Sequence, residues 1–198
     1  MLRTLFFDLG NVLLFFDHEK MVRQIALLCS LEPEVIRKAM HLYGDAYERG
    51  AMTNQKIFTE LSLLSQKSLC LEDLMEALGD IFEPNLPVIE LALELKKRGH
   101  PLFLLSNTCD AHFKYALDHY PFLRQFDGYV LSYEAGARKP EKKIYEEALK
   151  IAGCKAEDCF YTDDIAEYIT AARSLKIDAE QYTSPEELTQ HFVQRGIL

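Results

Sequence analysis

The sequence predicts an α/β protein: a parallel, Rossmann-like sheet with helices on both faces and an inserted four-helix cap. Short apolar runs such as Leu5–Phe7 and Leu102–Leu105 are typical of buried parallel strands. After the second run, apolar runs alternate with helical patterns, as in a sheet built from right-handed crossovers. Between the two runs only helical patterns occur, and helices segregated in this way indicate a separate lobe. We therefore expect a core of residues 1–14 and 86–198 and a cap of residues 15–85.

The predicted cap helices carry start and stop signals. Asp17 can cap the first helix and Thr53 the third. The second begins at Pro33 and is expected to close near Gly44, and the fourth spans about 72–82. The further core strands are expected at residues 102–105, 129–131 and 160–162, with a weak edge strand at 178–182.

Composition excludes several classes of partner. The chain has 198 residues, 48% of them hydrophobic, and a net charge of −9. Because the sequence has no Lys/Arg cluster, no nucleic-acid surface is expected, and an acidic surface offers little to an anionic membrane. No apolar run reaches the length of a membrane span.

Cysteine usage points to a reducing compartment. The five cysteines are an odd number without CxxC spacing, which argues against a disulfide framework and against a structural zinc site. Residues 1–3 lack the order of a signal peptide, and Asp8 interrupts the first apolar run. We therefore expect a cytoplasmic protein.

Polar groups follow three of the predicted strands. They are Asp8, the pair Ser106-Asn107 and the pair Asp163-Asp164, and Lys139 stands before a helix that Pro140 opens. In open parallel sheets the carboxyl ends of the strands form the ligand site, so these groups should converge. Each also fits a structural role, as a turn, a helix cap or a surface lysine, but their order and placement together favour a functional site.

The residue types in this cluster suit phosphoryl chemistry. Three carboxylates repel one another, and an oxygen-only ligand set favours Mg²⁺ over zinc. Lys139 and the Ser106 hydroxyl suit an anion such as phosphate. With the anion's charge neutralised, one carboxylate can attack phosphorus.

The same residues lie in four segments that resemble the motifs of the haloacid dehalogenase superfamily, which consists mostly of phosphatases. FFDLGNVLL places Asp8 at the nucleophile position, and LLSNT places Ser106 at the phosphate-binding hydroxyl. GARKPEKKIYEEAL places Lys139 at the motif lysine, and FYTDDIAEYITAA carries the acidic pair. The segment YERGAMTNQKIF and the DLGN of the first motif also resemble the subgroup that contains the bacterial α-D-glucose-1-phosphate phosphatase.

The resemblance implies a Mg²⁺-dependent phosphomonoesterase acting on a small phosphorylated substrate, such as a sugar phosphate. Asp8 would form an aspartyl-phosphate. The metal ligands would be Asp8, the Gly10 carbonyl and Asp164, with Asp163 acting directly or through water. The phosphate ligands would be Ser106, the Asn107 backbone and Lys139, while the cap closes over the site and selects the leaving group.

Two departures from the family pattern bear on activity. Most family phosphatases have a second Asp, as general acid and base, where this chain has Gly10, and many have Asn where it has Tyr168. Asp17 is a candidate for the missing proton donor. The departures leave open a weakened binding or regulatory protein, and a 2-haloacid dehalogenase is a third interpretation, against which the double acid speaks.

Other residues receive structural interpretations. The histidines, among them His18 and His112, show no metal-ligand spacing and are expected at the surface or partly buried. Phe15 and Phe16 are expected to pack within the cap.

Overall fold

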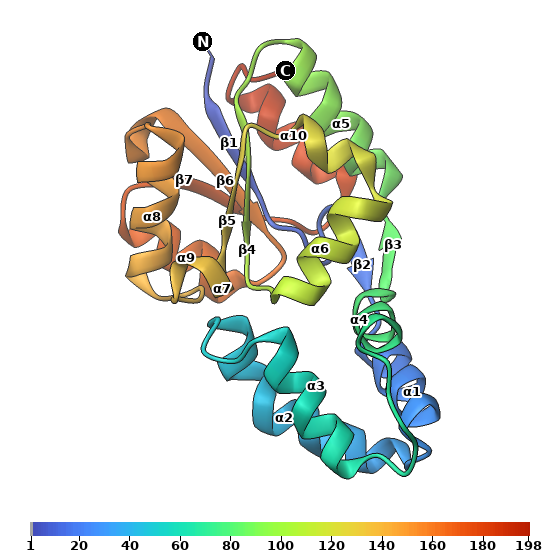
Figure 1. Ribbon diagram of the computed structural model, residues 1–198. Helices are drawn as coiled ribbons and strands as arrows, with labels where there is room; N and C mark the ends of the chain where they lie inside the picture. Colours follow the sequence, from blue (N-terminus) through green and yellow to red (C-terminus); the bar gives the residue numbers. More distant parts are fainter. Residues whose placement is uncertain (1) are drawn as a thin grey trace.

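The central feature of the computed structural model, which describes residues 2–198, is a five-stranded sheet in the order β5-β4-β1-β6-β7 (Figure 1). Every neighbouring pair in it is parallel. Its strands are β1 Thr4–Phe7, β4 Leu102–Ser106, β5 Gly128–Leu131, β6 Cys159–Asp163 and β7 Asp178–Gln181. The predicted α/β class is confirmed, and the expected weak edge strand is β7.

Both faces of the sheet are buried, as the continuous apolar run of β1 predicts. Leu5 and Phe7 lie in one apolar cluster, and Phe6 lies in another on the opposite face. Phe7 packs against Phe192 of α10 (Pro185–Gln194), with ring centroids 6.2 Å apart. The remaining core helices are α5 Leu86–Lys97, α6 Asp110–His119, α7 Ser132–Ala135, α8 Lys142–Ala152 and α9 Ala166–Ser174, with 3₁₀ turns η1 Pro121–Gln125 and η2 Ala156–Asp158.

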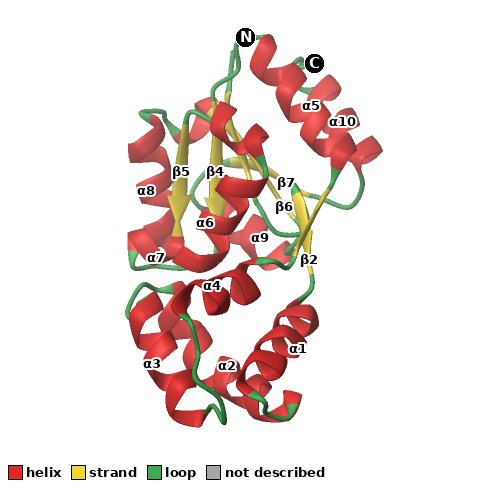
Figure 2. Ribbon diagram, turned by 45° about the vertical axis from the view of Figure 1, so that its right-hand side comes forward, coloured by secondary structure: helices red, strands yellow, loops and turns green. Residues whose placement is uncertain are grey.

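Four helices form a second lobe beyond the carboxyl ends of the strands. They are α1 His18–Cys29, α2 Pro33–Glu48, α3 Asn54–Leu64 and α4 Leu71–Gly79. Figure 2 shows the arrowheads of β4 and β5 pointing toward this lobe. The polar strand ends therefore face the cap helices.

A short antiparallel ribbon links the two lobes and was not expected from the sequence. It pairs β2 (Leu14–Phe16) with β3 (Phe82–Pro84), and Phe16 lies opposite Phe82. The helix expected to reach Phe82 ends at Gly79 instead. Strands of three residues are too short to leave a clear period of two in the sequence.

The predicted N-caps of α1 and α3 are confirmed, but the prediction that α2 ends near Gly44 is wrong. Asp17 accepts a hydrogen bond from the Lys20 amide as the N-cap of α1, and the Thr53 side chain caps α3 in the same way. Helix α2 continues through Gly44 to Glu48, and Gly50, with φ +68°, lies just beyond its end. A glycine inside a helix costs only about 1 kcal/mol, which the packing of α2 overrides.

In the described part of the chain, no helix combines the length and the apolar character that crossing a membrane requires.

Candidate active site

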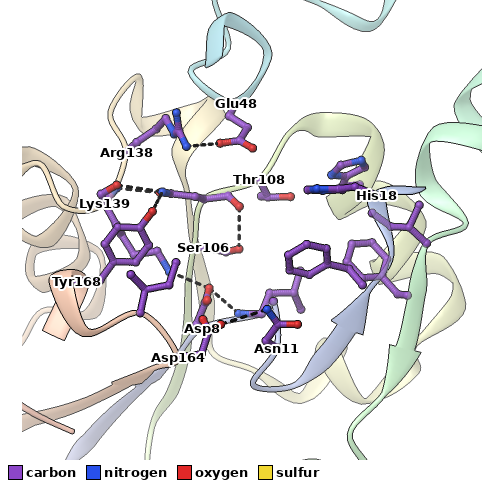
Figure 3. A pocket seen from close by; sticks show the side chains of 18 residues that line it. Asp8, Asn11, His18, Glu48, Ser106, Thr108, Arg138, Lys139, Asp164 and Tyr168 are labelled. Carbon is purple, nitrogen blue, oxygen red and sulfur yellow. Dashed lines mark hydrogen bonds and ion pairs between the residues drawn. The ribbon is translucent and has the colours of Figure 1, made fainter. Parts of the chain in front are cut away.

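The carboxyl ends of β1, β4 and β6 open into a cavity of about 230 Å³ between the core and the cap. Figure 3 shows the residues that line it. Asp8 follows β1 directly, Ser106 ends β4, and Asp163 ends β6. Parallel pairing places these three strands side by side, so their last residues come together as the sequence predicts.

Asp8 lies at the base of this cavity. Its side chain is almost fully buried, and its Oδ1 accepts a hydrogen bond from the Leu9 amide at 2.8 Å. The ammonium group of Lys139 lies 2.8 Å from the same oxygen. Burial raises the pKa of Asp8 to about 7, against the lowering effect of Lys139. The carboxylate needs a further positive charge to be fully ionised at neutral pH.

Lys139 is buried and bound on all sides. Its Nζ donates to Asp163 at 2.6 Å and to the Leu105 carbonyl at 3.0 Å, in addition to its ion pair with Asp8. The rings of Tyr161 and Tyr168 have centroids 5.9 Å and 5.2 Å from Nζ, within cation–π range. Burial lowers the pKa of Lys139, but the two carboxylates outweigh it, so the net direction is upward. The lysine therefore stays charged next to Asp8.

The two acids of the fourth motif have different surroundings. Asp163 Oδ1 accepts from the Ile165 amide at 2.8 Å, and Oδ2 accepts from Lys139 and from the Tyr161 hydroxyl. Asp164 is more open, and its Oδ2 accepts from the Asn11 amide group at 3.1 Å. Burial raises the pKa of Asp164, and the charge of Asp163 adds to the effect. Asp163 thus orients Lys139, whereas Asp164 faces the cavity.

The carboxylates of Asp8, Asp163 and Asp164 fit a divalent cation. One oxygen from each lies within 4.8 Å of the others. Burial raises the pKa of both Asp8 and Asp164, and the charge of Asp163 adds to it, so a bound cation would stabilise their ionised forms. An all-oxygen donor set suits Mg²⁺.

Ser106 and Asn107 belong to the same cavity but differ in what their side chains do. Ser106 is buried and lines the cavity wall. The Asn107 side chain is occupied: its Oδ1 accepts from the Lys139 amide at 2.8 Å, and its Nδ2 donates to the Lys139 carbonyl at 3.0 Å. The Asn107 amide group therefore fixes the backbone of the lysine, and only its backbone is available to an anion.

Gly10 and Tyr168, the two residues that differ from the family pattern, each make a contact that accounts for the residue type at that position. A Cβ on Gly10 would lie 2.8 Å from Cε1 of Phe16, whose ring fills the space beside the glycine. The Tyr168 hydroxyl accepts from Asn107 Nδ2 at 3.3 Å, so this tyrosine supports the Lys139 loop as well as covering the ammonium group. Phe16 lines the cavity and does not only pack within the cap, as the sequence had suggested.

The opposite wall of the cavity comes from residues that sequence reasoning missed. Arg138 and Glu48 form an ion pair of 2.9 Å across the gap between the lobes. His18 from α1 packs beside Phe16, and His112 from α6 packs beside Phe82. These groups come from the cap and from distant core segments, and no local pattern brings them together. The segment YERGAMTNQKIF, which contains Glu48, resembles a cap segment of one family subgroup, but that resemblance assigned none of its residues to the site.

Asp17, the proposed substitute proton donor, does not face the cavity. Its carboxylate accepts from the Lys20 amide at 3.0 Å and pairs with Arg23 at 3.2 Å, both on the first turns of α1. The side chain therefore caps a helix outside the site, and its assignment as the acid is not supported.

The four motifs, their order and this geometry define a class of protein. A family model described as "haloacid dehalogenase-like hydrolase" matches residues 2–176. The chain belongs to the haloacid dehalogenase-like hydrolases.

Several relatives resemble the chain over almost its whole length. A D-ribitol-5-phosphate phosphatase of Bacteroides thetaiotaomicron is 25% identical over 192 residues, which are 91% of this chain and 92% of the relative. A solved structure of a HAD family enzyme from the same organism, in complex with magnesium and inorganic phosphate, superposes with a TM-score of 0.82 at 24% identity, covering 97% of this chain and 100% of the other. A predicted HAD-like hydrolase from Porphyromonas gingivalis gives a TM-score of 0.77 at 25% identity, with 98% of both chains covered.

Proposed function

We propose that this chain is a Mg²⁺-dependent phosphomonoesterase that hydrolyses a small phosphorylated metabolite, such as a sugar phosphate, through an aspartyl-phosphate on Asp8. The observation that carries the proposal is the buried contact of Asp8 with Lys139 at the mouth of parallel strands, beside the Ser106 hydroxyl and the Asp164 carboxylate. Family membership and a phosphatase among the relatives support it. We further propose a cytoplasmic location without nucleic-acid or membrane partners, in keeping with five free cysteines and a net charge of −9.

In this proposal the chain's own residues bind and attack the phosphoryl group. Asp8 is the nucleophile, and the nearby ammonium group of Lys139 favours its ionised form and holds a phosphoryl oxygen. The Ser106 hydroxyl and the Asn107 backbone amide hold the other oxygens. Tyr161 and Asp163 keep Lys139 in place, so that the positive charge is fixed before the substrate arrives.

Mg²⁺ would be held by Asp8, the Gly10 carbonyl and Asp164. Asp163 would act through water, because both its oxygens already accept bonds from the protein. When bound, the cation neutralises phosphate charge and lowers the pKa of Asp8. Asn11, at φ 56°, holds the Asp164 carboxylate toward the cavity through its amide group.

We propose that residues 15–85 act as a cap on the core formed by 1–14 and 86–198. Arg138 links the lobes by pairing with Asp45 and Glu48 of α2, at 2.7 Å and 2.9 Å. A closed cap would exclude water from the phosphoryl group and contact the leaving group.

The test is phosphate release from a panel of sugar, polyol and aryl phosphates, with Mg²⁺ and with chelator. We expect turnover by the parent with Mg²⁺, and none by Asp8→Asn, because an amide is nearly isosteric but a poor nucleophile. Circular dichroism and the melting temperature should show that the variant is folded. Substantial residual turnover by Asp8→Asn would remove Asp8 from the nucleophile role.

A second candidate is a binding protein that keeps the fold with weakened chemistry. The observation that favours it is the Phe16 ring beside Gly10, which would have to move before an acid could occupy that position. A parent protein that binds Mg²⁺ and phosphate but turns over no ester in the panel would support this candidate.

A further inference from the structure

The family's usual acid is missing from this chain, and the ring of Phe16 lies beside Gly10, the position where that acid would stand. Phe16 lies in the space into which a side chain at position 10 would point, and its ring edge is 2.8 Å from the place that a Cβ on Gly10 would take. Asp17 caps α1 and faces away. For hydrolysis of an alkyl ester, the leaving oxygen needs a proton and the attacking water needs a base. Both must come from another side chain that lines the cavity.

Most titratable groups of the cavity have other partners. Asp8 and Lys139 pair with each other, and Asp164 accepts from Asn11. Glu48 lies in an ion pair with Arg138 on the opposite wall, but its Oε2 is buried and has no hydrogen-bond partner among residues 2–198, and burial raises its pKa.

Tyr168 is also a poor candidate for the acid. Burial raises the pKa of its hydroxyl, which makes it less able to give up a proton, and the hydroxyl already accepts from Asn107. Besides Glu48, whose charge faces Arg138, the groups that remain on the cavity wall are the two imidazoles of His18 and His112.

The two imidazoles form one stacked unit with the ring that fills the space at Gly10. The His18 ring lies 4.7 Å from Phe16 and 6.0 Å from His112, measured between centroids, and the two imidazole planes differ by 25°. Phe82 packs edge-on against His112 at 6.0 Å. In Figure 3, His18 lies across the cavity from Lys139 and Tyr168, with Thr108 between them. His18 therefore lies on the side of the cavity opposite Lys139, where the leaving group of a phosphate bound to Lys139 would lie.

The two rings differ in what they can do. His112 Nε2 is buried and has no hydrogen-bond partner among residues 2–198. Burial and the neighbouring His18 lower the pKa of His112 to about 3, so this ring stays neutral. His18 begins α1 and is more exposed, and burial lowers its pKa as well, which makes its protonated form a stronger acid. His18 can exchange protons, whereas His112 offers a fixed, neutral surface.

We propose that His18 is the acid and base of this site, that His112 is the residue that positions it, and that an alcohol oxygen or a water binds beside the two rings. The inference rests on the proposed phosphomonoesterase function and adds to it the group that Gly10 lacks.

The proton balance closes over one cycle. As Asp8 bonds to phosphorus, the ester P–O bond breaks, and its electron pair goes to the leaving oxygen, which takes a proton from the His18 imidazolium. Water then attacks phosphorus and gives its proton to the neutral His18. The P–O bond to Asp8 breaks, and that electron pair returns to the carboxylate. His18 is again protonated, and one water has been consumed per alcohol and phosphate released.

The experiment compares His18→Asn with the parent on an alkyl phosphate and on p-nitrophenyl phosphate, using rapid-mixing kinetics with Mg²⁺. For the alkyl ester, where the acid is needed, kcat should fall roughly 10²–10⁴-fold. For the nitrophenyl ester, whose leaving group needs no proton, the first turnover should stay fast and steady-state release should become slow. A burst of nitrophenolate then appears, because the phosphorylated Asp8 waits for its base.

Three further variants separate proton transfer from structure. His18→Gly should regain turnover when imidazole is added, because the free ring can occupy the vacated place. His112→Asn should lower kcat without a change in KM, and its burst of nitrophenolate should be smaller than that of His18→Asn, because His18 is still present but less well positioned. His41→Asn, an exposed histidine on α2, is the matched control and should behave as the parent.

Equal losses on both esters, no burst and no rescue by imidazole would overturn the proposal and leave His18 a structural role. Parent-like kinetics of His18→Asn would overturn it as well, while the proposed phosphomonoesterase function would stand. A parent without turnover on any ester would refute the proposed function, and the role of His18 would fall with it.

Discussion

Lys139 bonds to three acceptors at once, and one of them is Asp163. Asp163 and Asp164 therefore differ in how far the protein already occupies their carboxylates. Its Nζ bonds to Asp163, Asp8 and the Leu105 carbonyl. Asp163 also accepts from Tyr161 and from the Ile165 amide, whereas Asp164 has one partner, Asn11. The sequence presents two adjacent aspartates, but the fold makes the first a part of the buried ion-pair network and leaves the second for a ligand.

This difference predicts opposite effects of the two amide substitutions on stability without metal. Asp163→Asn should lower the free energy of unfolding in chelator by about 1.5–3 kcal/mol, because it removes one of the two carboxylates that pair with the buried Lys139. Asp164→Asn should leave it unchanged or raise it, because it removes a carboxylate that its surroundings disfavour. Denaturant unfolding in chelator measures both. A clear loss of stability for Asp164→Asn would mean that this acid is a structural partner and not a free ligand.

The strand-end residues were predictable because each stands directly after a buried strand. Asp8, Ser106 and Asp164 needed only the rule that parallel strands end at one edge. Gly10 and Tyr168 were recognised as departures, but their consequences were not visible, because the ring of Phe16 reaches Gly10 through a ribbon that the sequence does not reveal.

At the scale of elements, helix α2 seats the cap on the core through its last turn. The Ser132 hydroxyl of α7 donates to the Glu48 carbonyl at 2.6 Å, and Arg49 pairs with Glu141 at 2.7 Å. A Cβ on Gly50 would lie 2.1 Å from the Tyr133 carbonyl oxygen, so the backbones of the two lobes are in direct contact there. The sequence suggested that the helix stops at Gly44, which is in fact an interior residue.

We therefore expect opposite effects on stability when Gly44 and Gly50 are each replaced by alanine. Gly44→Ala should stabilise the protein by about 0.5–1 kcal/mol, because the position is helical and a Cβ there meets nothing within 4 Å. Gly50→Ala should destabilise it by at least about 1 kcal/mol, because the residue has φ +68° and would collide with Tyr133. It should also reduce kcat/KM by moving α2 off the core.

Unfolding in denaturant and phosphate-release kinetics test the pair. Similar effects of the two substitutions on stability, or unchanged kcat/KM for Gly50→Ala, would mean that the close approach at Tyr133 does not seat the cap.

At the scale of the whole molecule, the site lies at the interface between the two lobes. The half that we propose binds phosphate comes from one sheet edge and follows from sequence order. Its other half combines α1, α2 and α6 with the ribbon, and depends on how the lobes are placed. No local pattern encodes that placement, so His18 and His112, which lie far apart in the chain, appeared as unrelated surface histidines.

His112, at the interface between the lobes, also makes the stability of the whole molecule depend on pH. His112 of α6 packs against His18 of α1 and Phe82 of β3, and burial lowers its pKa to about 3 from an ordinary value of 6.5. Above pH 6.5 the ring is neutral in the folded and the unfolded chain and contributes nothing. As the pH falls from 6.5 toward 3, the unfolded chain takes up a proton that the folded chain refuses, so the folded state loses stability.

His112→Gln should remove this part of the acid sensitivity. The free energy of unfolding in chelator, measured at about pH 7 and about pH 5, should fall less in the variant than in the parent, by on the order of 1 kcal/mol. His119→Gln, an exposed histidine on the same helix, is the control and should fall as much as the parent. The three proteins share the same carboxylates, so the contribution of these groups to the pH dependence cancels when the proteins are compared. An equal fall in the free energy of unfolding for His112→Gln and the parent would contradict this prediction. It would mean that His112 is protonated in the folded protein as readily as in the unfolded chain.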